Sequence, residues 1–499
     1  MGFLRPFYKK VLSRVWDSVP RKEHYMRKTK IVCTIGPASD SAAMMRELIK
    51  SGMNVARLNF SHGTHESHKK VIDTFKEVRE ESGKPVALLL DTKGPEIRLR
   101  TFKDGMKPYL KKGSVFTLTT EDIEGDESRA SITYKDLPRQ LEEGKRVLID
   151  DGRIELCVEK CTETDVVCKV IHGGEISAKK GINLPYTHLD MPYLSENDKA
   201  DLKFGIENDV DFVAASFVRC KEDVIDLRKF LDYYGGHNIK IISKIENIEG
   251  VENFDEILEY SDGIMVARGD MGVEVEYERL PGIQKKFIRR CYRAGKMVIT
   301  ATQMLESMIK NPTPTRAEIT DVANAVFDGT SAVMLSGETA MGAHPDLVVR
   351  VMSKIVCQAE EDYFDMNMSC IGGLDVDTKD KTNAICDACC TTARDLKASA
   401  IIAVTKSGET ARRMSKFRPL EKIVAATPEI KTYHQLALSW GVYPVLALNQ
   451  DEEERLFMHA IDCAKQIDAV SKGDTVVITA GVPLGMPGTT NLLKVETVK

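Results

Sequence analysis

The stretch Ile239-Lys240-Ile241-Ile242-Ser243-Lys244-Ile245-Glu246-Asn247 contains the pattern that decides the fold. It is a short apolar run that ends in charged residues, and a helical segment follows it before the next such run. Near-continuous apolar runs are typical of strands buried on both faces of a parallel sheet. The chain contains eight of them: Ile31–Ile35, Val55–Leu58, Val86–Leu90, Phe212–Ser216, Ile239–Ile245, Gly263–Ala267, Met297–Thr302 and Ala332–Leu335. Eight strand–helix units in succession predict an α/β fold, a closed (β/α)8 or TIM barrel.

A long insert separates the third apolar run from the fourth. It holds shorter strand-like pieces between glycine-bearing turns. These pieces are Val115–Thr119, Arg146–Asp150, Ile154–Val158 and Val166–Val170. We therefore expect a small β-barrel domain at residues 95–192, placed as a lid over the barrel mouth, with the barrel itself formed by residues 26–94 and 193–362.

A third unit follows the eighth strand. A helix at about Pro345–Asp362 leads into a linker around Met366–Lys381, and strand-like runs then alternate with helical segments. The runs are Ala400–Val404, Lys422–Ala425, Val442–Ala447 and Asp474–Ile478. The pattern predicts a C-terminal α/β domain at residues 363–499.

Residues 1–25 form a basic N-terminal extension that differs from the rest of the chain. An apolar stripe at helical spacing runs along it. The stripe consists of Leu4, Tyr8, Val11, Leu12, Val15 and Val19. Three interpretations stay open: a surface extension, a membrane-surface or targeting helix, and an extension that arises from a start upstream of Met26.

The composition excludes several classes of protein. The 70 Lys and Arg residues against 75 Asp and Glu residues give a net charge of −5, which is too balanced for binding nucleic acid by bulk charge. Twelve scattered cysteines in 499 residues indicate reduced thiols rather than a disulfide scaffold. We expect Cys386, Cys389 and Cys390 to pack along one helix rather than to bind a metal. No apolar run is long enough to span a membrane, so we expect a cytoplasmic protein.

Charged and polar residues follow most of the eight apolar runs. In a closed parallel barrel these strand ends meet at one mouth, where the chemistry of such barrels lies. Glu246 and Asp270 offer two carboxylates to a hard cation such as Mg²⁺. Arg57, Arg98 and Lys244 suit phosphoryl oxygens. An oxygen set with one negative charge, suited to a monovalent cation, consists of Asn59, Ser61, Asp91 and Thr92. The alternative is a salt-bridge network that closes the barrel end.

Several of these stretches resemble the site motifs of the pyruvate kinase family. They are Arg57–Gly63, Asp91–Arg98, Ile242–Asn247, Met265–Gly272 and Ala301–Glu306. The resemblance extends from about Met26 to Lys499 and includes the order of barrel, inserted lid and C-terminal effector domain. It implies the last step of glycolysis, the transfer of the phosphoryl group of phosphoenolpyruvate to ADP, in a cytoplasmic homotetramer under allosteric control.

The resemblance also implies the role of each site residue. Glu246 and Asp270 would bind Mg²⁺, and the set Asn59, Ser61, Asp91 and Thr92 would bind K⁺. Arg57 would contact the substrate phosphate, and Lys244 would stabilise the transferring phosphoryl group. The backbone of Gly269 and Asp270 would receive the substrate carboxylate, and Thr302 would lie near the methylene carbon that is protonated. The nucleotide would contact His62, Arg98 and Lys180. Glu96 is the residue that accompanies K⁺ dependence in this family, whereas a lysine there supplies the charge instead.

The loop after the run Ala400–Val404 predicts a second phosphate site. Hydroxyl groups and backbone N–H groups precede a helix there, and such a helix start attracts anions. The residues are Thr405, Lys406, Ser407, Gly408 and Thr410. They resemble the family's effector loop, as does Gly485–Thr490, and imply a phosphorylated small-molecule effector, either a sugar phosphate or a nucleoside monophosphate. Helix capping alone would also explain Ser407 and Thr410, and Glu409 would repel a phosphate if it faced one.

Two other classes of function remain as alternatives. A lyase that acts on phosphoenolpyruvate or pyruvate could use the same kind of barrel, but it has no ADP for Arg98 and Lys180 to contact. A metabolite-sensing protein without activity would need a broken site, whereas the residues of the expected site are all present.

Overall fold

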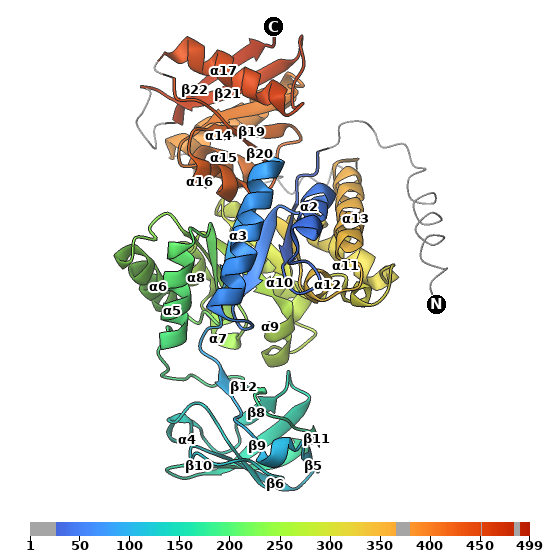
Figure 1. Ribbon diagram of the computed structural model, residues 1–499. Helices are drawn as coiled ribbons and strands as arrows, with labels where there is room; N and C mark the ends of the chain where they lie inside the picture. Colours follow the sequence, from blue (N-terminus) through green and yellow to red (C-terminus); the bar gives the residue numbers. More distant parts are fainter. Residues whose placement is uncertain (1–25, 366–379, 451, 484–489) are drawn as a thin grey trace, which may run out of the picture.

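The computed structural model describes residues 26–365, 380–450, 452–483 and 490–499. Three units lie one above another, with the lid at the bottom of Figure 1, the barrel in the middle and the C-terminal unit at the top. The basic extension 1–25, most of the predicted linker and nearly all of the loop Gly485–Thr490 lie outside the described residues.

Eight parallel strands form a closed barrel, as the sequence predicts. The strands are β1 (Lys30–Thr34), β2 (Val55–Asn59), β3 (Ala87–Asp91), β13 (Phe212–Ala215), β14 (Lys240–Ile245), β15 (Gly263–Ala267), β16 (Met297–Ala301) and β17 (Ala332–Leu335). Nearly every residue in them is buried, because side chains on one face fill the barrel and those on the other pack against helices. The ring closes where Lys30 pairs with Ala332.

Helices surround the barrel, and short helices follow the carboxyl ends of several strands. They are α2 (Ala42–Ser51), α3 (His65–Ser82), α5 (Glu196–Glu207), α6 (Lys221–Tyr233), α7 (Ile248–Glu252), α8 (Phe254–Tyr260), α9 (Arg268–Glu274), α10 (Leu280–Arg293), α11 (Arg316–Phe327), α12 (Gly337–Ala340) and α13 (Pro345–Asp365), with a 3₁₀ turn η2 (Glu306–Ile309). Local sequence fixes several starts. At α5, Ser195 accepts a hydrogen bond from the amide of Asp198 while the Asp198 side chain accepts one from the amide of Ser195.

The insert folds as the predicted small β-barrel. Its strands are β4 (Ile97–Arg98), β6 (Val115–Thr119), β7 (Arg129–Ser131), β8 (Arg146–Ile149), β9 (Ile154–Cys161), β10 (Asp165–His172) and β12 (Gly181–Asn183); β5 (Tyr109–Leu110) pairs with β11 (Gly174–Glu175), and η1 (Lys103–Gly105) and α4 (Leu137–Gln140) lie in connections. The two ends of its seven-stranded sheet meet, because Leu99 bridges to Ile132 and the amide of Arg100 donates to the Ser131 carbonyl at 2.8 Å.

The C-terminal unit is an α/β sheet with helices on both faces. It contains α14 (Lys381–Asp395), β18 (Ala400–Val404), α15 (Glu409–Ser415), β19 (Lys422–Thr427), α16 (Ile430–Gln435), η3 (Leu436–Leu438), β20 (Val442–Leu446), α17 (Glu453–Gln466), β21 (Thr475–Gly481) and β22 (Thr490–Thr497). The strand order is β20-β19-β18-β21-β22, with β22 antiparallel at the edge. Cys386 and Cys389 are buried in the core on α14, as predicted.

The residues just before β1 join the barrel to the C-terminal unit. The carboxylate of Glu360 on α13 accepts hydrogen bonds from the amides of Lys28 (3.0 Å) and Thr29 (2.5 Å). The ammonium of Lys28 donates to the carbonyls of Pro419 (3.1 Å) and Glu421 (2.9 Å). The short segment therefore lies between two folded units and bonds to both.

No helix within the described ranges is long and apolar enough to cross a lipid bilayer. The cysteines that the structure describes are free thiols, as the sequence predicts.

Candidate active site

A buried charged cluster lies at the carboxyl ends of the barrel strands, centred on Lys244. The ammonium of Lys244 lies 3.0 Å from Asp91 Oδ1 and 3.0 Å from Glu246 Oε1. It also donates to Ser216 Oγ at 2.7 Å. All three of its partners lie at ends of parallel strands, so the barrel itself brings them together.

Arg57 holds the other side of Asp91. Its Nε lies 2.6 Å from Asp91 Oδ2, and its Nη1 donates to Thr34 Oγ1 at 2.8 Å. Burial alone would raise the pKa of Asp91, but the charges of Arg57 and Lys244 outweigh it and hold that pKa below its usual value. Asp91 is therefore ionised and fixes both cations in place.

Burial raises the pKa of Glu246 to about 8, and the neighbouring charges of Asp270 and Asp91 add to this effect against the attraction of Lys244. The backbone amide of Phe217 donates to Glu246 Oε2 at 2.7 Å. The carboxylates of Glu246 and Asp270 repel each other, and a divalent cation bound between them would relieve this repulsion. Within the described ranges no group of three or more metal-binding side chains occurs, so such an ion would also need oxygens from substrate or water.

The residues predicted for a monovalent cation lie at and just after the ends of the neighbouring strands β2 and β3. Asn59 is paired with Asp91 in the register of β2 and β3. Asn59 Oδ1 accepts a hydrogen bond from the amide of Ser61 at 3.1 Å, and the Thr92 carbonyl accepts one from Ser216 Oγ at 2.6 Å. Neutral oxygens around one carboxylate fit a K⁺ ion better than a divalent ion.

The start of α9 meets Thr302. The amide of Gly269 donates to Thr302 Oγ1 at 2.8 Å, so the two residues predicted to face the substrate are in contact. Thr302 has a φ of 68°, which is uncommon for a β-branched residue. Arg268 stabilises this backbone by donating to the Thr302 carbonyl at 2.6 Å. Strained backbone of this kind is concentrated at functional sites.

A cleft of about 660 Å³ separates the lid from the barrel mouth. Arg98 and Lys180 line it from the lid, and Asp270 lines it from the barrel. Each lid cation already has a partner: Arg98 Nε lies 2.6 Å from Glu96 Oε2, and Lys180 Nζ lies 2.6 Å from Asp150 Oδ1. His62 is exposed at the turn before α3 and is not among the described residues that line this cleft.

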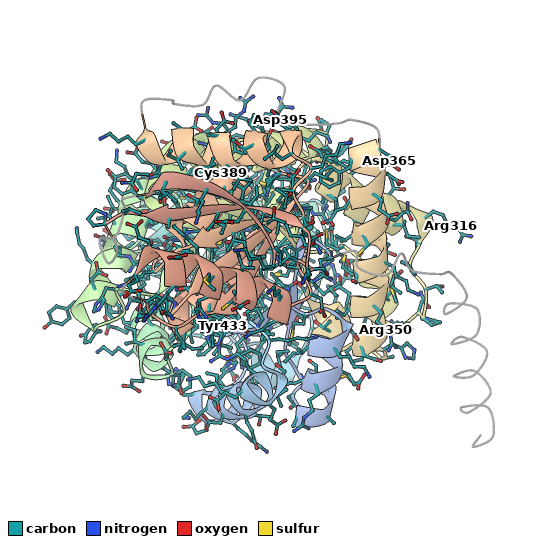
Figure 2. All side chains as sticks on the ribbon, turned by 90° about the horizontal axis from the view of Figure 1, so that it is seen from above. Arg316, Arg350, Asp365, Cys389, Asp395 and Tyr433 are labelled. Carbon is teal, nitrogen blue, oxygen red and sulfur yellow. The ribbon has the colours of Figure 1, made fainter. Side chains whose placement is uncertain are left out.

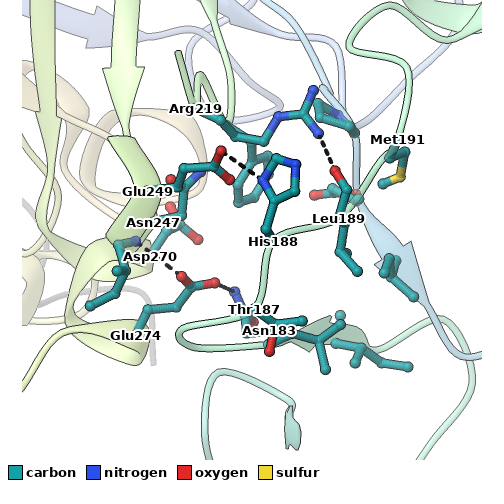
Figure 3. Close-up of a pocket in the computed structure, with 18 of the residues that line it drawn as sticks. Asn183, Thr187, His188, Leu189, Met191, Arg219, Asn247, Glu249, Asp270 and Glu274 are labelled. Atoms are coloured by element: carbon teal, nitrogen blue, oxygen red, sulfur yellow. Dashed lines mark hydrogen bonds and ion pairs between the residues drawn. The ribbon is translucent and has the colours of Figure 1, made fainter. Parts of the chain in front are cut away.

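The lid is tied to the barrel by a few polar contacts (Figure 3). Glu274 on α9 accepts from Asn183 Nδ2 on the lid at 3.2 Å, and within the barrel it accepts from the amide of Ile248 at 3.2 Å. His188 Nδ1 lies 2.9 Å from Glu249 Oε1. The contacts are few and partly exposed, which fits a lid that changes position.

The predicted effector loop follows β18 as a tight turn. Thr405 Oγ1 accepts from the amide of Gly408 at 3.0 Å, and Gly408 has a φ of 79°. Lys406 and Ser407 are exposed, whereas Thr410 is buried with its hydroxyl 2.7 Å from Thr490 Oγ1. Glu409 pairs with Arg413 at 2.7 Å, so its charge is partly neutralised.

Sequence reasoning missed Ser216, Asp150 and Arg413. Ser216 follows β13, and the strand-end argument would have found it had it been applied to the fourth strand. Asp150 stands at the end of the predicted strand Arg146–Asp150, where the sequence gives no sign that Lys180 binds it across neighbouring lid strands. Arg413 lies one turn after Glu409, at the spacing at which helical ion pairs form.

Comparison with known proteins agrees with this geometry. Residues 26–349 match the family model described as pyruvate kinase, barrel domain, and residues 383–496 match pyruvate kinase, alpha/beta domain. The chain is 50% identical over 477 residues to a pyruvate kinase of Staphylococcus saprophyticus, covering 95% of this chain and 81% of the relative. It is 48% identical over 476 residues to a pyruvate kinase of Clostridium acetobutylicum, covering 95% of this chain and 100% of the relative.

Proposed function

We propose that this chain, which belongs to the pyruvate kinase family, transfers the phosphoryl group of phosphoenolpyruvate to ADP with the help of Mg²⁺ and K⁺. The observation that carries this proposal is the position of Lys244. Its ammonium is fixed by Asp91, Glu246 and Ser216 at the end of the barrel, beside a cleft whose lid carries Arg98 and Lys180.

In this proposal the substrate phosphate lies against Arg57 and Lys244. Phosphoryl transfer proceeds through a loose transition state and needs positioning and charge neutralisation more than covalent help. Lys244 is buried, so its charge acts on the transferring group in a medium of low dielectric constant. Asp91 keeps both cations oriented, which removes the need for reorganisation during the reaction.

Glu246 and Asp270 would hold Mg²⁺, and Asn59, Ser61, Asp91 and Thr92 would hold K⁺. Both ions would supply further positive charge at the site. The amides of Gly269 and Asp270 at the start of α9 receive the substrate carboxylate, since N–H groups there attract anions. Thr302 then lies beside the methylene carbon of the enolate and takes part in its protonation.

The nucleotide enters from the lid side. Arg98 and Lys180 leave Glu96 and Asp150 in order to contact its phosphates, and His62 contacts it from the turn before α3. Because both lid cations are already ordered by ion pairs, little side-chain entropy is lost when they exchange a carboxylate for a phosphate.

The test measures pyruvate formation from phosphoenolpyruvate and ADP in matched K⁺ and Na⁺ buffers, with and without Mg²⁺. We expect turnover that needs Mg²⁺ and is higher in K⁺. Equal turnover in K⁺ and Na⁺ would remove the proposed monovalent site and leave the transfer reaction in place. Pyruvate formed without ADP would instead favour a lyase, and no pyruvate with either ion would overturn the proposal.

We also propose the finer features that the family resemblance implies. These are the domain boundaries given above, a homotetramer in the cytoplasm, a place at the last step of glycolysis, and control by a phosphorylated effector at Thr405, Lys406, Ser407, Gly408 and Thr410. Arg413 and Arg412 lie on the helix that follows this loop, and Arg412 Nη2 donates to the Ser407 carbonyl at 2.8 Å. Both arginines pair with Glu409, and Arg413 also pairs with Asp380 at 2.6 Å, so a phosphate at this loop would compete with these carboxylates.

A further inference from the structure

The turn that follows β16 holds two successive residues in the left-handed backbone region. Thr302 has a φ of 68° and Gln303 a φ of 53°. This region is uncommon for residues with a side chain and most unfavourable for β-branched ones such as threonine, so it persists only where surrounding contacts fix it. The turn therefore depends on contacts from outside its own sequence to keep Thr302 against the start of α9.

Arg268, the first residue of α9, supplies these contacts. Its Nε donates to the Ala301 carbonyl at 3.2 Å, and its Nη2 donates to the Thr302 carbonyl at 2.6 Å. The hydroxyl of Thr302 donates to the same Ala301 carbonyl at 2.6 Å. Because the guanidinium and the hydroxyl share one acceptor, the position of Arg268 affects both the backbone of the turn and the direction of the Thr302 hydroxyl.

Two helices of the outer layer hold Arg268 in turn. Its Nη1 donates to Asp321 Oδ1 on α11 at 2.8 Å and to Gln284 Oε1 on α10 at 3.4 Å. The first residue of α11, Arg316, projects from the edge of the molecule in Figure 2, which places this helix at the outside of the barrel. Asp321 is not among the described residues that line the cleft, so it acts on the site through Arg268.

This arrangement differs from an ordinary ion pair between two helices. Arg268 is buried, and its planar fork reaches two carbonyls of the turn while Asp321 and Gln284 hold its remaining nitrogen. A lysine carries a single point charge and could not make these contacts at once. A pair that only joined α9 to α11 would not need the two bonds to the turn that carries Thr302.

We infer that Arg268 and Asp321 are positioning residues for the proton transfer at Thr302. After phosphoryl transfer, the methylene carbon of the enolate gains a proton by way of the Thr302 hydroxyl. The electrons of the C=C bond form the new C–H bond, the enolate oxygen becomes the carbonyl oxygen of pyruvate, and Thr302 regains a proton from water. Phosphoryl transfer depends instead on Lys244 of β14, so a displaced Thr302 slows the proton step more than the transfer. This inference rests on the proposed function and deepens it.

The experiment compares the two steps in the same enzyme. Initial rates of ATP formation from phosphoenolpyruvate and ADP report the transfer. A group that delivers a proton to the methylene carbon also removes one from the methyl group in the reverse direction. Exchange of the methyl protons of pyruvate in D₂O, followed by proton NMR with Mg²⁺, K⁺ and inorganic phosphate present, therefore reports the proton step. The ratio of the exchange rate to the transfer rate does not depend on the folded fraction of the sample, so a purely structural loss leaves it unchanged.

Two variants disturb the fork from opposite ends. Asp321→Ala removes the carboxylate that holds Nη1, and Arg268→Lys keeps the charge but loses the fork. We expect the ratio to fall about tenfold in both, a part of the roughly 10²–10⁴-fold that a positioned proton-transfer group contributes. Asp321→Asn keeps an acceptor oxygen and should restore the ratio. Asp346→Ala is the matched control, because it also removes a carboxylate 2.8 Å from an arginine, Arg350 on α13, and it should keep the wild-type ratio.

The outcomes separate the positioning role from the proposed function. If the wild type forms no ATP, the proposed function is overturned and the positioning role with it. If the wild type forms ATP and both variants keep its ratio, or if it forms ATP without exchanging methyl protons, the positioning role is overturned and the transfer reaction stands. A lower ratio in Asp346→Ala as well would show general loosening of the barrel and also overturn the positioning role. Asp321→Ala and Arg268→Lys change different residues, so if one does not fold the other still decides.

Discussion

Lys244 Nζ and Glu246 Oε1 lie 3.0 Å apart at the end of β14, and one residue separates them in the sequence. In an extended strand, residues two apart lie on the same face. The pair therefore points into the barrel mouth together, and Asp91 contacts the same ammonium from β3. Two carboxylates therefore fix the position of this ammonium, whereas a lysine without partners would move freely on its four-carbon chain.

The first prediction concerns that ammonium. Lys244→Met is expected to lower kcat by at least roughly 10²–10³-fold, the usual loss when one preorganised charge or donor is removed. Steady-state kinetics with phosphoenolpyruvate and ADP measure it. Lys221→Met is the control, since Lys221 forms an exposed ion pair with Glu256 at 2.9 Å and should retain full activity. Near-normal kcat in Lys244→Met would contradict the role assigned to it.

A second prediction concerns Glu96 and the monovalent ion. Glu96→Lys is expected to reduce the activation by K⁺ relative to Na⁺, because a fixed ammonium supplies charge near the phosphates. Both Glu96→Lys and Glu96→Gln lose the ion pair with Arg98, but only the first adds a charge. The ratio of initial rates in K⁺ and Na⁺ should therefore fall in Glu96→Lys and stay high in Glu96→Gln. The same ratio in both variants would show that lost pairing, not added charge, matters.

The third prediction is a pH dependence of stability at Lys30. Its ammonium lies under Tyr443, 4.7 Å from the ring centre, and donates to the Val442 carbonyl at 2.7 Å. Burial and the charges of Arg27 and Lys28, against the attraction of Glu360, together lower the pKa of Lys30 from 10.5 to about 7. Between pH 7 and 10.5 the unfolded chain therefore binds more protons at this position than the folded chain does.

Stability should accordingly rise with pH through that window, and it should be lost as the pH falls toward 7. The slope from one such group is at most about 1.4 kcal/mol per pH unit. In Lys30→Met the rise in Tm from pH 7 to pH 9 should be smaller than in wild type, whatever the absolute Tm. Lys50→Met removes an exposed lysine and should leave the slope unchanged. A slope equal to wild type in Lys30→Met would refute the prediction.

A fourth prediction concerns the end of the barrel that faces the C-terminal unit. Leu438→Ala removes a fully buried side chain from the barrel interior, and such truncations cost about 2–5 kcal/mol. Hydrogen exchange should speed up in β13 and β14, although the residue lies in the C-terminal unit. Leu420→Ala, at a site 62% exposed in the same unit, should change the exchange little. Faster exchange confined to the C-terminal unit would contradict the packing described here.

The apolar runs predicted the barrel strands to within a residue or two, because burial on both faces leaves a continuous signal. The predicted run Ile31–Ile35 corresponds to β1 at Lys30–Thr34 and is shifted by one position. The shift arises because Lys30 is polar, so an apolar run begins after it, although the residue is buried in the strand. The edge strand β22 was missed. Its residues Thr490–Thr497 mix apolar and polar side chains, so the strand has no continuous apolar run. The shortest lid strands have only two residues, which is too short to show an alternation of apolar and polar side chains.

The candidate site likewise contains residues that the sequence predicts and residues that it does not. Charged residues after apolar runs are visible in sequence, and Arg57, Asp91, Lys244 and Glu246 do lie in contact. Ser216 carries no charge and so did not stand out, although its hydroxyl bonds both Lys244 and the Thr92 carbonyl. The pairing of Lys180 with Asp150 depends on the register between the lid strands β8 and β12, and no local sequence pattern predicts that register.

The position of Leu438 also constrains how this protein is made. All eight barrel strands have been synthesised once translation reaches Leu335, yet the innermost layer of the barrel still lacks the side chains that fill its end nearest the C-terminal unit. Until η3 emerges from the ribosome, the nascent barrel is nearly complete but the apolar side chains at one end of its interior are exposed. Exposed apolar surface of this kind is prone to aggregation and is the usual target of chaperones. The catalytic unit of this chain therefore becomes self-sufficient only after much of the following unit has been translated.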